Sequence, residues 1–329
     1  MTWKGKKVLV TGAEGFIGSH LTEALVKKGA VVTAMVKNNF QQHLGWIEEF
    51  EPGVRKRLKI CFSDLNDYNA VEDAVGDNDI IFHLGAEISV PYSYVNPRTF
   101  VHTNIMGTLN VLMASKEHGV KKIIHMSTSE VYGTPDTVPI REDHQLKGQS
   151  PYSATKIGAE KLAESFFASY DLPVVVVRAF NTYGPRQSAR AIIPTLITQA
   201  LFRDEIFMGN DKPTRDFNFV SDTVNGLIKI AENDKLAGQV INLGSGNEIS
   251  MGGLLSKILR LTRSKAAVKK DRKRLRPGKS EVMRLLADGS KMKRLTGWKP
   301  ETSLDEGLKK TVAWINNNPR HFKIGEYQI

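Results

Sequence analysis

The fold is decided near the start of the chain by residues 7–18, which read Lys-Val-Leu-Val-Thr-Gly-Ala-Glu-Gly-Phe-Ile-Gly. The first five form an apolar run typical of a buried strand, and the apolar spacing of residues 16–28 is helical. Glycines stand three apart at the junction, at Gly12, Gly15 and Gly18. Such glycines permit a tight turn, let the backbone approach a pyrophosphate and let helix pack on strand. The stretch therefore predicts a dinucleotide site.

The helix that follows completes this site. Its first turn, with Phe16 and Ile17, directs free N–H groups towards the expected phosphates. We therefore count both residues among the cofactor-binding candidates.

Short apolar runs continue to alternate with helical segments through the first half of the chain. This alternation predicts an α/β fold with a Rossmann-type, doubly wound parallel sheet covered on both faces. Further strands are expected at residues 31–36, 57–62, 80–84, 122–127 and 173–178, and further helices at 104–118 and 152–170.

After residue 178 the pattern loosens. We expect residues 1–178 to form mainly the dinucleotide-binding domain and residues 179–329 mainly a smaller substrate-binding lobe over the carboxyl edge of the sheet, where such folds bind ligands. The two parts interleave, because a strand at 238–243 is expected to return. Helices are expected at 191–201 and 304–314.

Composition fits a soluble globular protein, with 329 residues, 41% of them hydrophobic and 25% charged. No apolar stretch is long enough to span a membrane, and the first residues do not resemble a signal peptide. The single cysteine, Cys61, cannot form an internal disulfide. We expect a cytoplasmic protein without membrane contact.

The net charge is +11, and the basic residues are densest in residues 265–276, which hold seven Lys or Arg and one Asp. This run is either a solvated surface or a rim that attracts an anionic substrate. Nucleic acid is not an expected partner, because no aromatic residues interleave the run and no binding motif accompanies it.

The end of the second strand bears on the choice of cofactor. NAD sites usually carry Asp or Glu there, but residues 34–39 read Ala-Met-Val-Lys-Asn-Asn. Lys37 is therefore a cofactor-binding candidate that could meet a 2′-phosphate or simply be exposed. NAD remains the expected cofactor and NADP the alternative, and we expect no metal site.

Two further strand ends supply cofactor-binding candidates. Asp64 and Leu65 follow the third strand, where Asp64 can accept from the adenine amino group. Leu84, Gly85 and Ala86 end the fourth strand, where small residues let a ribose lie close.

A catalytic cluster is expected around Tyr152 and Lys156, which lie four apart on one helix face. A neighbouring ammonium and a positive nicotinamide favour the tyrosine phenolate, which can accept a hydroxyl proton as hydride leaves. Thr128, Ser129 and Glu130 end the fifth strand at the same edge. Thr128 is well placed to form a hydrogen bond with the reacting hydroxyl. Glu130 is a candidate general base for a second proton transfer, or else an exposed or helix-capping residue.

Together these residues resemble the extended short-chain dehydrogenase/reductase family, the nucleotide-sugar epimerases and dehydratases. The resemblance covers essentially the whole chain. It includes the motifs Asn181-x-Tyr-Gly-Pro-Arg, Thr214-Arg-Asp-Phe, Asn242-x-Gly-x-Gly, Arg276-Pro-Gly and Gly297-Trp-x-Pro. Within the family the chain looks most like NDP-sugar 4,6-dehydratases acting on nucleotide-linked N-acetylglucosamine, with GDP or UDP, in legionaminic-acid-type pathways.

The resemblance implies a substrate, its contacts and a reaction. Asn181 would lie near the diphosphate of a nucleotide sugar, and Arg190, Arg215 and Arg276 would contact that substrate. Hydride would leave carbon 4, Glu130 would take the carbon-5 proton as water departs from carbon 6, and hydride would return to carbon 6. Family members commonly form homodimers through the helices that begin near Asn104 and Tyr152.

Other reactions stay open, because many 4,6-dehydratases have Asp where this chain has Ser129. The Thr-Ser-Glu form also looks like that of GDP-mannose dehydratases and UDP-glucuronate decarboxylases. A decarboxylase would need a cation for the substrate carboxylate, and a 4-epimerase would have less use for Glu130. A non-catalytic dinucleotide-sensing protein is a remote alternative, since a sensor needs no tyrosine base.

Overall fold

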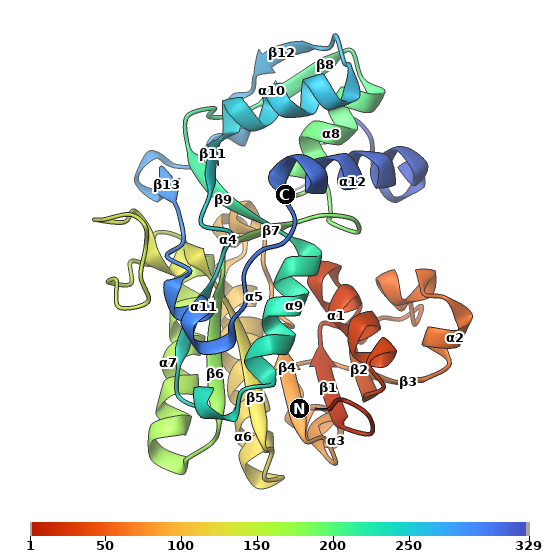
Figure 1. Ribbon diagram of the computed structural model, residues 1–329, viewed down its shortest axis with the longest axis vertical. Helices are drawn as coiled ribbons and strands as arrows, with labels where there is room; N and C mark the ends of the chain where they lie inside the picture. The colour runs from red at the N-terminus through yellow and green to blue at the C-terminus, as the bar shows by residue number, and fades with distance from the viewer. Residues whose placement is uncertain (1, 327–329) are drawn as a thin grey trace.

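The computed structural model, which describes residues 2–326, is built around a seven-stranded parallel sheet (Figure 1). The strand order is β10-β6-β5-β4-β1-β2-β3, and each neighbouring pair is parallel. The chain therefore winds outward from β1 in both directions, which confirms the predicted Rossmann-type fold. The strands are β1 (Lys7–Thr11), β2 (Val31–Lys37), β3 (Leu58–Ser63), β4 (Ile80–His83), β5 (Lys122–Thr128), β6 (Val174–Ala179) and β10 (Val240–Leu243).

Both faces of this sheet are buried, because alternate side chains of each strand pack against different helices. Val8 and Val10 belong to the cluster that contains α1 and α9 residues, whereas Leu9 packs with residues of α3, α6 and α7. Burial on both faces explains why the strands read as nearly continuous apolar runs. The helices are α1 (Phe16–Lys27), α3 (Tyr68–Val75), α6 (Gly107–Glu117), α7 (Pro151–Tyr170) and α9 (Val220–Ala231).

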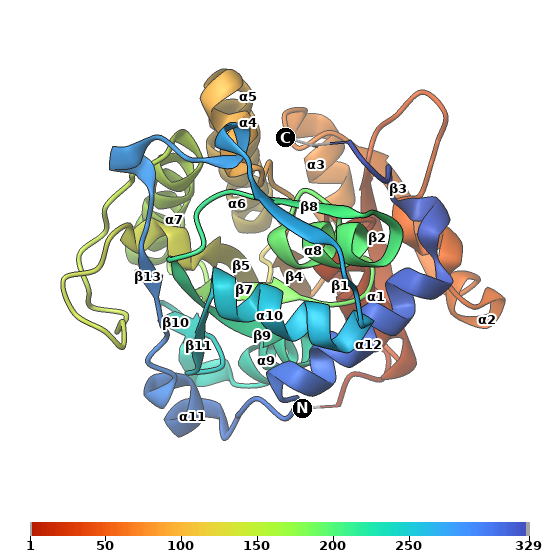
Figure 2. The same cartoon turned by 90° about the horizontal axis from the view of Figure 1, so that it is seen from above.

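After β6 the chain leaves the sheet, builds a smaller lobe above its carboxyl edge, and returns to it (Figures 1 and 2). Strand β9 pairs with β7, β11 and β13, and β8 pairs with β12. The strands of the lobe are β7 (Asn181–Tyr183), β8 (Glu205–Met208), β9 (Thr214–Phe219), β11 (Glu248–Ser250), β12 (Ala267–Lys270) and β13 (Arg284–Leu285), and its helices are α8 (Ile192–Phe202), α10 (Met251–Thr262) and α12 (Leu304–Asn317).

The returning strand, expected at residues 238–243, is β10, and it lies at the edge of the main sheet beside β6. Val240 pairs with Val176 there. Helix α11 (Ser290–Thr296) also packs near β10, and short helices α2 (Pro52–Arg55) and α4 (Val90–Val95) lie in connections. Within residues 2–326, no helix combines the length and apolar character needed to cross a membrane.

The helix expected at residues 104–118 differs from the prediction. It begins earlier, as α5 (Pro97–Phe100), continues through a π-helical turn (Val101–Met106) and becomes α6. Gly107 follows this turn and packs tightly, because an added Cβ there would lie 2.9 Å from the Cβ of Leu65. A π turn breaks the 3.6-residue period, so apolar spacing alone does not reveal it.

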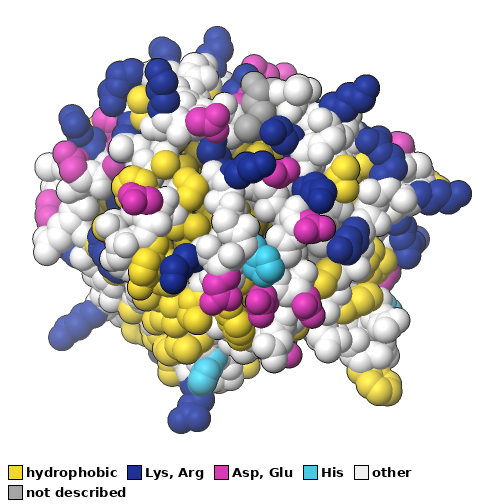
Figure 3. All heavy atoms as spheres, turned by 90° about the horizontal axis from the view of Figure 1, so that it is seen from below, with side chains coloured by type: hydrophobic (Ala, Val, Ile, Leu, Met, Phe, Trp, Pro, Cys, Tyr) yellow, Lys and Arg dark blue, Asp and Glu magenta, His cyan; other side chains and the backbone are white. Residues whose placement is uncertain are grey.

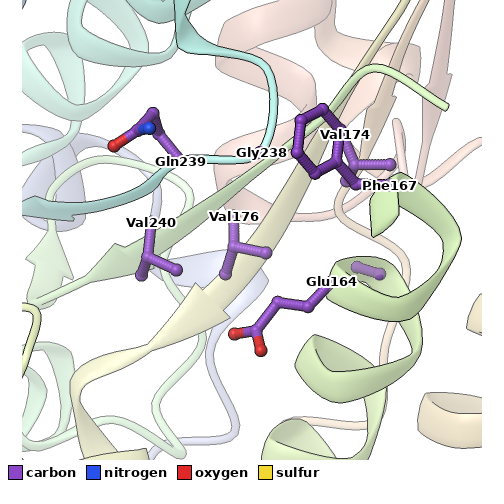
Figure 4. Close-up of a pocket in the computed structure, with 8 residues that line it drawn as sticks. Glu164, Phe167, Val174, Val176, Gly238, Gln239 and Val240 are labelled. Carbon is purple, nitrogen blue, oxygen red and sulfur yellow. The ribbon is translucent and has the colours of Figure 1, made fainter. Parts of the chain in front are cut away.

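A small cavity lies near the amino end of β6 and the end of α7 (Figure 4). Its volume is about 10 Å³, which leaves room for about one water molecule. Phe167 packs on the backbone of Gly238, where an added Cβ would lie 2.2 Å from the phenyl ring. The cavity thus lies at the edge of the sheet opposite to the expected site.

Candidate active site

The glycine loop joins β1 to α1 by a turn that only small residues permit. Gly12 has φ +67°, and an added Cβ there would lie 3.0 Å from the Cα of Gly85 at the end of β4. At Gly18 an added Cβ would lie 2.0 Å from the Gly12 carbonyl oxygen, so helix α1 packs directly on the loop. These close approaches agree with the roles expected for the glycines.

The first turn of α1 is open to an anion. Gly15 caps the helix with no side-chain hydrogen bond, and the first turn contains no acidic residue. Phe16 and Ile17 begin the helix and are half-buried. The free N–H groups and the positive end of the helix dipole fit the pyrophosphate of a dinucleotide.

The ends of β1, β3 and β4 meet beside this turn. The hydroxyl of Thr11 accepts hydrogen bonds from the N–H groups of Leu84 and Gly85, at 3.1 and 2.9 Å. An added Cβ on Gly85 would lie 2.9 Å from the side chain of Leu65. Ala86 follows and is half-buried. The strand-end candidates are therefore brought together, as parallel strands require.

Two other cofactor candidates already have partners. Asp64 is exposed, and its Oδ1 accepts from both the backbone and the side-chain nitrogen of Asn66 at 2.9 Å. Lys37 is also exposed, and its Nζ donates to Oε1 of Glu87 at 3.1 Å. The Lys37 ammonium is therefore held by a carboxylate.

Tyr152 lies in the first turn of α7 and is only 8% exposed, packed with Val90 and Phe100. Burial raises the pKa of Tyr152, a hydrogen bond with Thr128 lowers it, and the charge of Glu130 raises it. Tyr152 is therefore protonated in the unliganded protein. The side chains of Tyr152, Thr128 and Glu130 therefore lie close together at the carboxyl end of β5.

The neighbouring Lys156 is buried one turn along α7. Its Nζ donates to the carbonyl oxygen of Met126 at 2.6 Å. Burial lowers the pKa of Lys156 to about 8, while the charge of Glu160 raises it. The lysine is consequently charged near neutral pH, at a cost in folding free energy.

Replacing Lys156 with methionine is expected to raise the melting temperature near pH 7 by about 2–4 °C. The folded protein holds this proton less tightly than the unfolded chain, with a pKa of about 8 against 10.5. Between those values wild-type stability rises with pH, so the advantage of the variant should disappear near pH 10.5. Thermal melts across this range measure it, and an unchanging difference would contradict the burial argument.

Glu130 lies in a 3-10 turn (Ser129–Tyr132) that is capped by the side chain of Thr128. Thr128 Oγ1 accepts from the N–H of Glu130 at 3.2 Å, and Ser129 is buried. The Glu130 carboxylate is 11% exposed and pairs with the guanidinium of Arg276 at 3.3 Å. The candidate base thus lies inside the site rather than on the surface.

The arginines of the lobe occupy different environments. Arg276 ends the basic run 265–276, in which every residue of β12 is exposed, and turns inward to Glu130. Arg215 is buried and lies 3.9 Å from the Glu281 carboxylate. Burial lowers the pKa of Arg276, but the negative charges of Glu130 and Glu281 outweigh this effect. The pKa of Arg276 is therefore raised above its usual value. The two guanidinium groups thus place positive charge close to the Glu130 carboxylate.

The remaining substrate candidates differ in exposure. Asn181 begins β7, and its amide nitrogen is buried without a hydrogen-bond partner among the described residues. An unsatisfied donor at this edge suits a phosphate oxygen. Arg190 is exposed on the loop before α8, and the structure does not bring it to the cluster around Glu130.

A buried network that the sequence analysis missed ties the catalytic elements together. Arg178 of β6 donates to both carboxylate oxygens of Glu160 on α7, at 2.8–3.2 Å, and to the hydroxyl of Tyr132 at 3.0 Å. Tyr132 in turn donates to Asn242 of β10 at 2.6 Å. The network fixes α7, which carries Tyr152, against the 3-10 turn that carries Glu130. In the sequence, this network is indicated only by Arg178, a charged residue within the otherwise apolar strand β6.

Asn104, at the π-helical turn, was also missed as a site residue. Its side chain accepts from the N–H of Glu87 at 2.8 Å and donates to the Glu87 carbonyl oxygen and the Thr155 hydroxyl at 3.0 Å. It joins the segment after β4 to α7. A polar residue at a buried helical position could have indicated this role.

Comparison with known proteins adds an independent line of evidence. Residues 9–311 match the family model described as GDP-mannose 4,6 dehydratase. The chain is 35% identical over 321 residues to the UDP-N-acetyl-alpha-D-glucosaminuronate decarboxylase of Bacillus cytotoxicus, covering 94% of this chain and 98% of that protein. It is also 35% identical over 317 residues to the UDP-glucuronate 4-epimerase of Thermodesulfobacterium geofontis, covering 94% and 96%.

A solved structure with the same fold contains a cofactor. It is a double mutant of the dTDP-glucose 4,6-dehydratase of Streptomyces venezuelae with NAD bound. The TM-score is 0.86 at 27% identity, covering 96% of this chain and 98% of that one. By their names, these three relatives perform decarboxylation, epimerisation and dehydration.

Proposed function

Because the chain belongs to the GDP-mannose 4,6-dehydratase family, within the short-chain dehydrogenase/reductase enzymes that modify nucleotide sugars, we propose that it is a nucleotide-sugar 4,6-dehydratase. Its substrate is a nucleotide-linked hexose, GDP- or UDP-N-acetylglucosamine, and its product is the 4-keto-6-deoxy sugar. Its cofactor is NAD. In this proposal residues 1–178 mainly hold the dinucleotide, and residues 179–329 mainly hold the nucleotide sugar.

One observation carries the choice of dehydration, namely the position of Glu130. Its carboxylate is largely buried and close enough to Tyr152 to raise the pKa of the phenol. A simple alcohol oxidation or epimerisation needs only the tyrosine base. A second carboxylate beside it supplies the general base that elimination across carbons 5 and 6 requires.

The residues then divide the reaction between them. Bound NAD supplies a hydride acceptor for carbon 4, a donor for carbon 6, and a positive charge that favours the Tyr152 phenolate. Tyr152 takes the proton of the carbon-4 hydroxyl, which Thr128 orients. Glu130 takes the carbon-5 proton, and the carbon-6 hydroxyl accepts a proton from solvent and departs as water. Carbon 5 then regains a solvent proton when hydride returns to carbon 6.

Substrate binding follows from the unsatisfied and cationic groups at this edge. The free amide donor of Asn181 suits the diphosphate. Arg215 and Arg276 supply positive charge for the nucleotide part, with geometry suited to phosphate oxygens. Arg190, which is exposed, would contribute only at the rim.

Decarboxylation of a nucleotide-linked uronic acid is a second candidate, and Arg276 favours it. That guanidinium lies 3.3 Å from Glu130. In this alternative it would face a substrate carboxylate at carbon 6 instead of the nucleotide part. Ser129, in the position where many dehydratases carry an acid, agrees with this alternative.

Incubation of the purified protein with each nucleotide sugar in deuterated water tests the proposal. Dehydration of N-acetylglucosamine derivatives lowers the mass by one water and introduces solvent deuterium at carbon 5. Decarboxylation of UDP-glucuronate or UDP-N-acetylglucosaminuronate releases carbon dioxide instead. If GDP- and UDP-N-acetylglucosamine return unchanged or only epimerised, the dehydratase proposal fails.

A homodimer is the expected assembly, through the π turn with α6 and through α7. Seen from below, the molecule shows hydrophobic side chains gathered on one part of its surface (Figure 3). Along these helices, exposed apolar residues are Val101, Met106, Met113 and Tyr170. An interface along these helices would bury such exposed apolar side chains.

The double substitution Met106→Glu and Met113→Glu is expected to shift the protein from dimer to monomer, raising the dissociation constant at least about tenfold, the equivalent of about 1.4 kcal/mol. Light scattering after gel filtration measures the mass. Val268→Glu is the matched control, because Val268 is similarly exposed on β12. A double variant that remains dimeric places the interface elsewhere.

A further inference from the structure

An acidic side chain from another segment lies at the end of β2, although the residues of that strand end include no Asp or Glu. Glu14, in the glycine loop, accepts a hydrogen bond through Oε1 from the backbone N–H of Lys37 at 2.9 Å. Lys37 is the last residue of β2. A carboxylate from the glycine loop therefore lies where dinucleotide-binding folds usually place an Asp or Glu from the strand itself.

The second oxygen of this carboxylate has no partner. Glu14 Oε2 is shielded from solvent and forms no hydrogen bond to any residue in the range 2–326. Leaving a carboxylate oxygen buried without a donor is unfavourable, and native proteins seldom do so. The free oxygen thus indicates a donor that the chain itself does not supply.

The segment after β2 holds Glu14 in this position. The N–H of Trp46 donates to the Glu14 carbonyl oxygen at 3.1 Å. Gly45 has φ +53°, and an added Cβ there would lie 2.8 Å from that oxygen and 3.0 Å from the Glu14 Cβ. Only glycine allows the segment to pack so closely, so the segment after β2 holds Glu14 in place by packing against its backbone and Cβ.

The charges around the end of β2 favour a neutral ribose over a phosphorylated one. Lys37 is the basic residue there, and its ammonium pairs with Glu87. With Glu14 and Glu87 both acidic, carboxylates outnumber the ammonium in this cluster. A 2′-phosphate would meet the Glu14 carboxylate, whereas a ribose hydroxyl could donate to it.

We infer that Glu14 is the residue that makes this site select NAD over NADP. Its carboxylate accepts a hydroxyl of the adenosine ribose and repels a 2′-phosphate. The inference rests on the proposed function only in requiring that the chain bind a dinucleotide. Because it concerns binding, it is tested without any sugar and stands or falls separately from the reaction.

The test compares the two dinucleotides in direct competition. Wild-type protein and Glu14→Gln are incubated with an equimolar mixture of NAD and NADP, and the dinucleotide retained by each is released by denaturation and quantified. Glutamine keeps an acceptor for the Lys37 N–H but removes the charge. A hydrogen bond to a charged group accounts for about ten- to hundredfold in affinity, so the NAD-to-NADP ratio should fall at least about tenfold. Glu14→Lys should lower it further.

A matched control tests the loop without the charge. Glu48 accepts from the N–H of Leu44 at 2.8 Å in the segment that clamps Glu14. Glu48→Gln should leave the ratio unchanged, and thermal melts verify that each variant is folded. Equal retention of both dinucleotides by the wild type, or an unchanged ratio in folded Glu14→Gln, overturns the inference. If Glu14→Gln lowers the NAD-to-NADP ratio but the wild-type protein performs no dehydration, the inference about Glu14 holds and the proposed reaction is wrong.

Discussion

Tyr152→Phe is expected to reduce turnover of the nucleotide sugar by about 10²–10⁴-fold, the range that a positioned acid–base group supplies. The ring remains packed with Val90 and Phe100, so the fold and the binding of both ligands should survive. Without the phenol, the proton of the carbon-4 hydroxyl loses its proposed acceptor, so hydride transfer from carbon 4 should slow by the same factor. Rapid mixing of the NAD-loaded variant with substrate should therefore show reduced cofactor forming about 10²–10⁴-fold more slowly than in the wild type.

The control for this variant is another phenol in the same surroundings. Tyr92 lies near Phe100, with ring centroids 6.2 Å apart. Tyr92→Phe removes a hydroxyl without touching the proposed base, so turnover should stay within a few-fold of wild type. Normal turnover by Tyr152→Phe would remove Tyr152 from the mechanism altogether.

Glu130→Gln is expected to separate the two proton transfers. Oxidation at carbon 4 should proceed, because Tyr152 and Lys156 are intact, and the phenol loses a neighbouring negative charge that raises its pKa. Elimination should slow by about 10²–10⁴-fold, since glutamine cannot accept the carbon-5 proton. Reduced cofactor should accumulate in a single turnover, with no solvent deuterium entering carbon 5.

Glu130→Asp provides the graded comparison, because it keeps the charge but retracts it by one methylene. It should retain more elimination activity than the amide and preserve a longer ion pair with Arg276. A Glu130→Gln variant that eliminates water at the wild-type rate would transfer the base role to another residue. Loss of carbon-4 oxidation as well would show that Glu130 acts on the first step.

Much of the fold was predictable because it depends on local patterns. Buried parallel strands read as apolar runs, and the glycines around Gly12 are required by backbone contacts that no larger residue allows. Tyr152 and Lys156 were found for a similar reason, since four-residue spacing places both on one face of α7. The π turn before α6 was missed because it interrupts the helical period.

Contacts between distant segments were not predictable from spacing. Arg276 reaches Glu130 across 146 residues, and nothing near either one indicates the other. The Glu14 carboxylate meets the end of β2 because β2 lies parallel beside β1, so that its carboxyl end adjoins the glycine loop. In both cases the sequence identifies the charged residue, and the tertiary fold alone determines its partner.

Strand β10 affects how the protein can be made by a ribosome. The seventh strand lies at residues 240–243 of 329, so a nascent chain that has only reached β6 presents an unpaired parallel edge. Open edges of this kind pair readily with other chains. The newly synthesised amino-terminal half is therefore vulnerable to aggregation along β6 until the lobe has been translated and β10 pairs with that strand, and a gene truncated after residue 178 should yield insoluble protein.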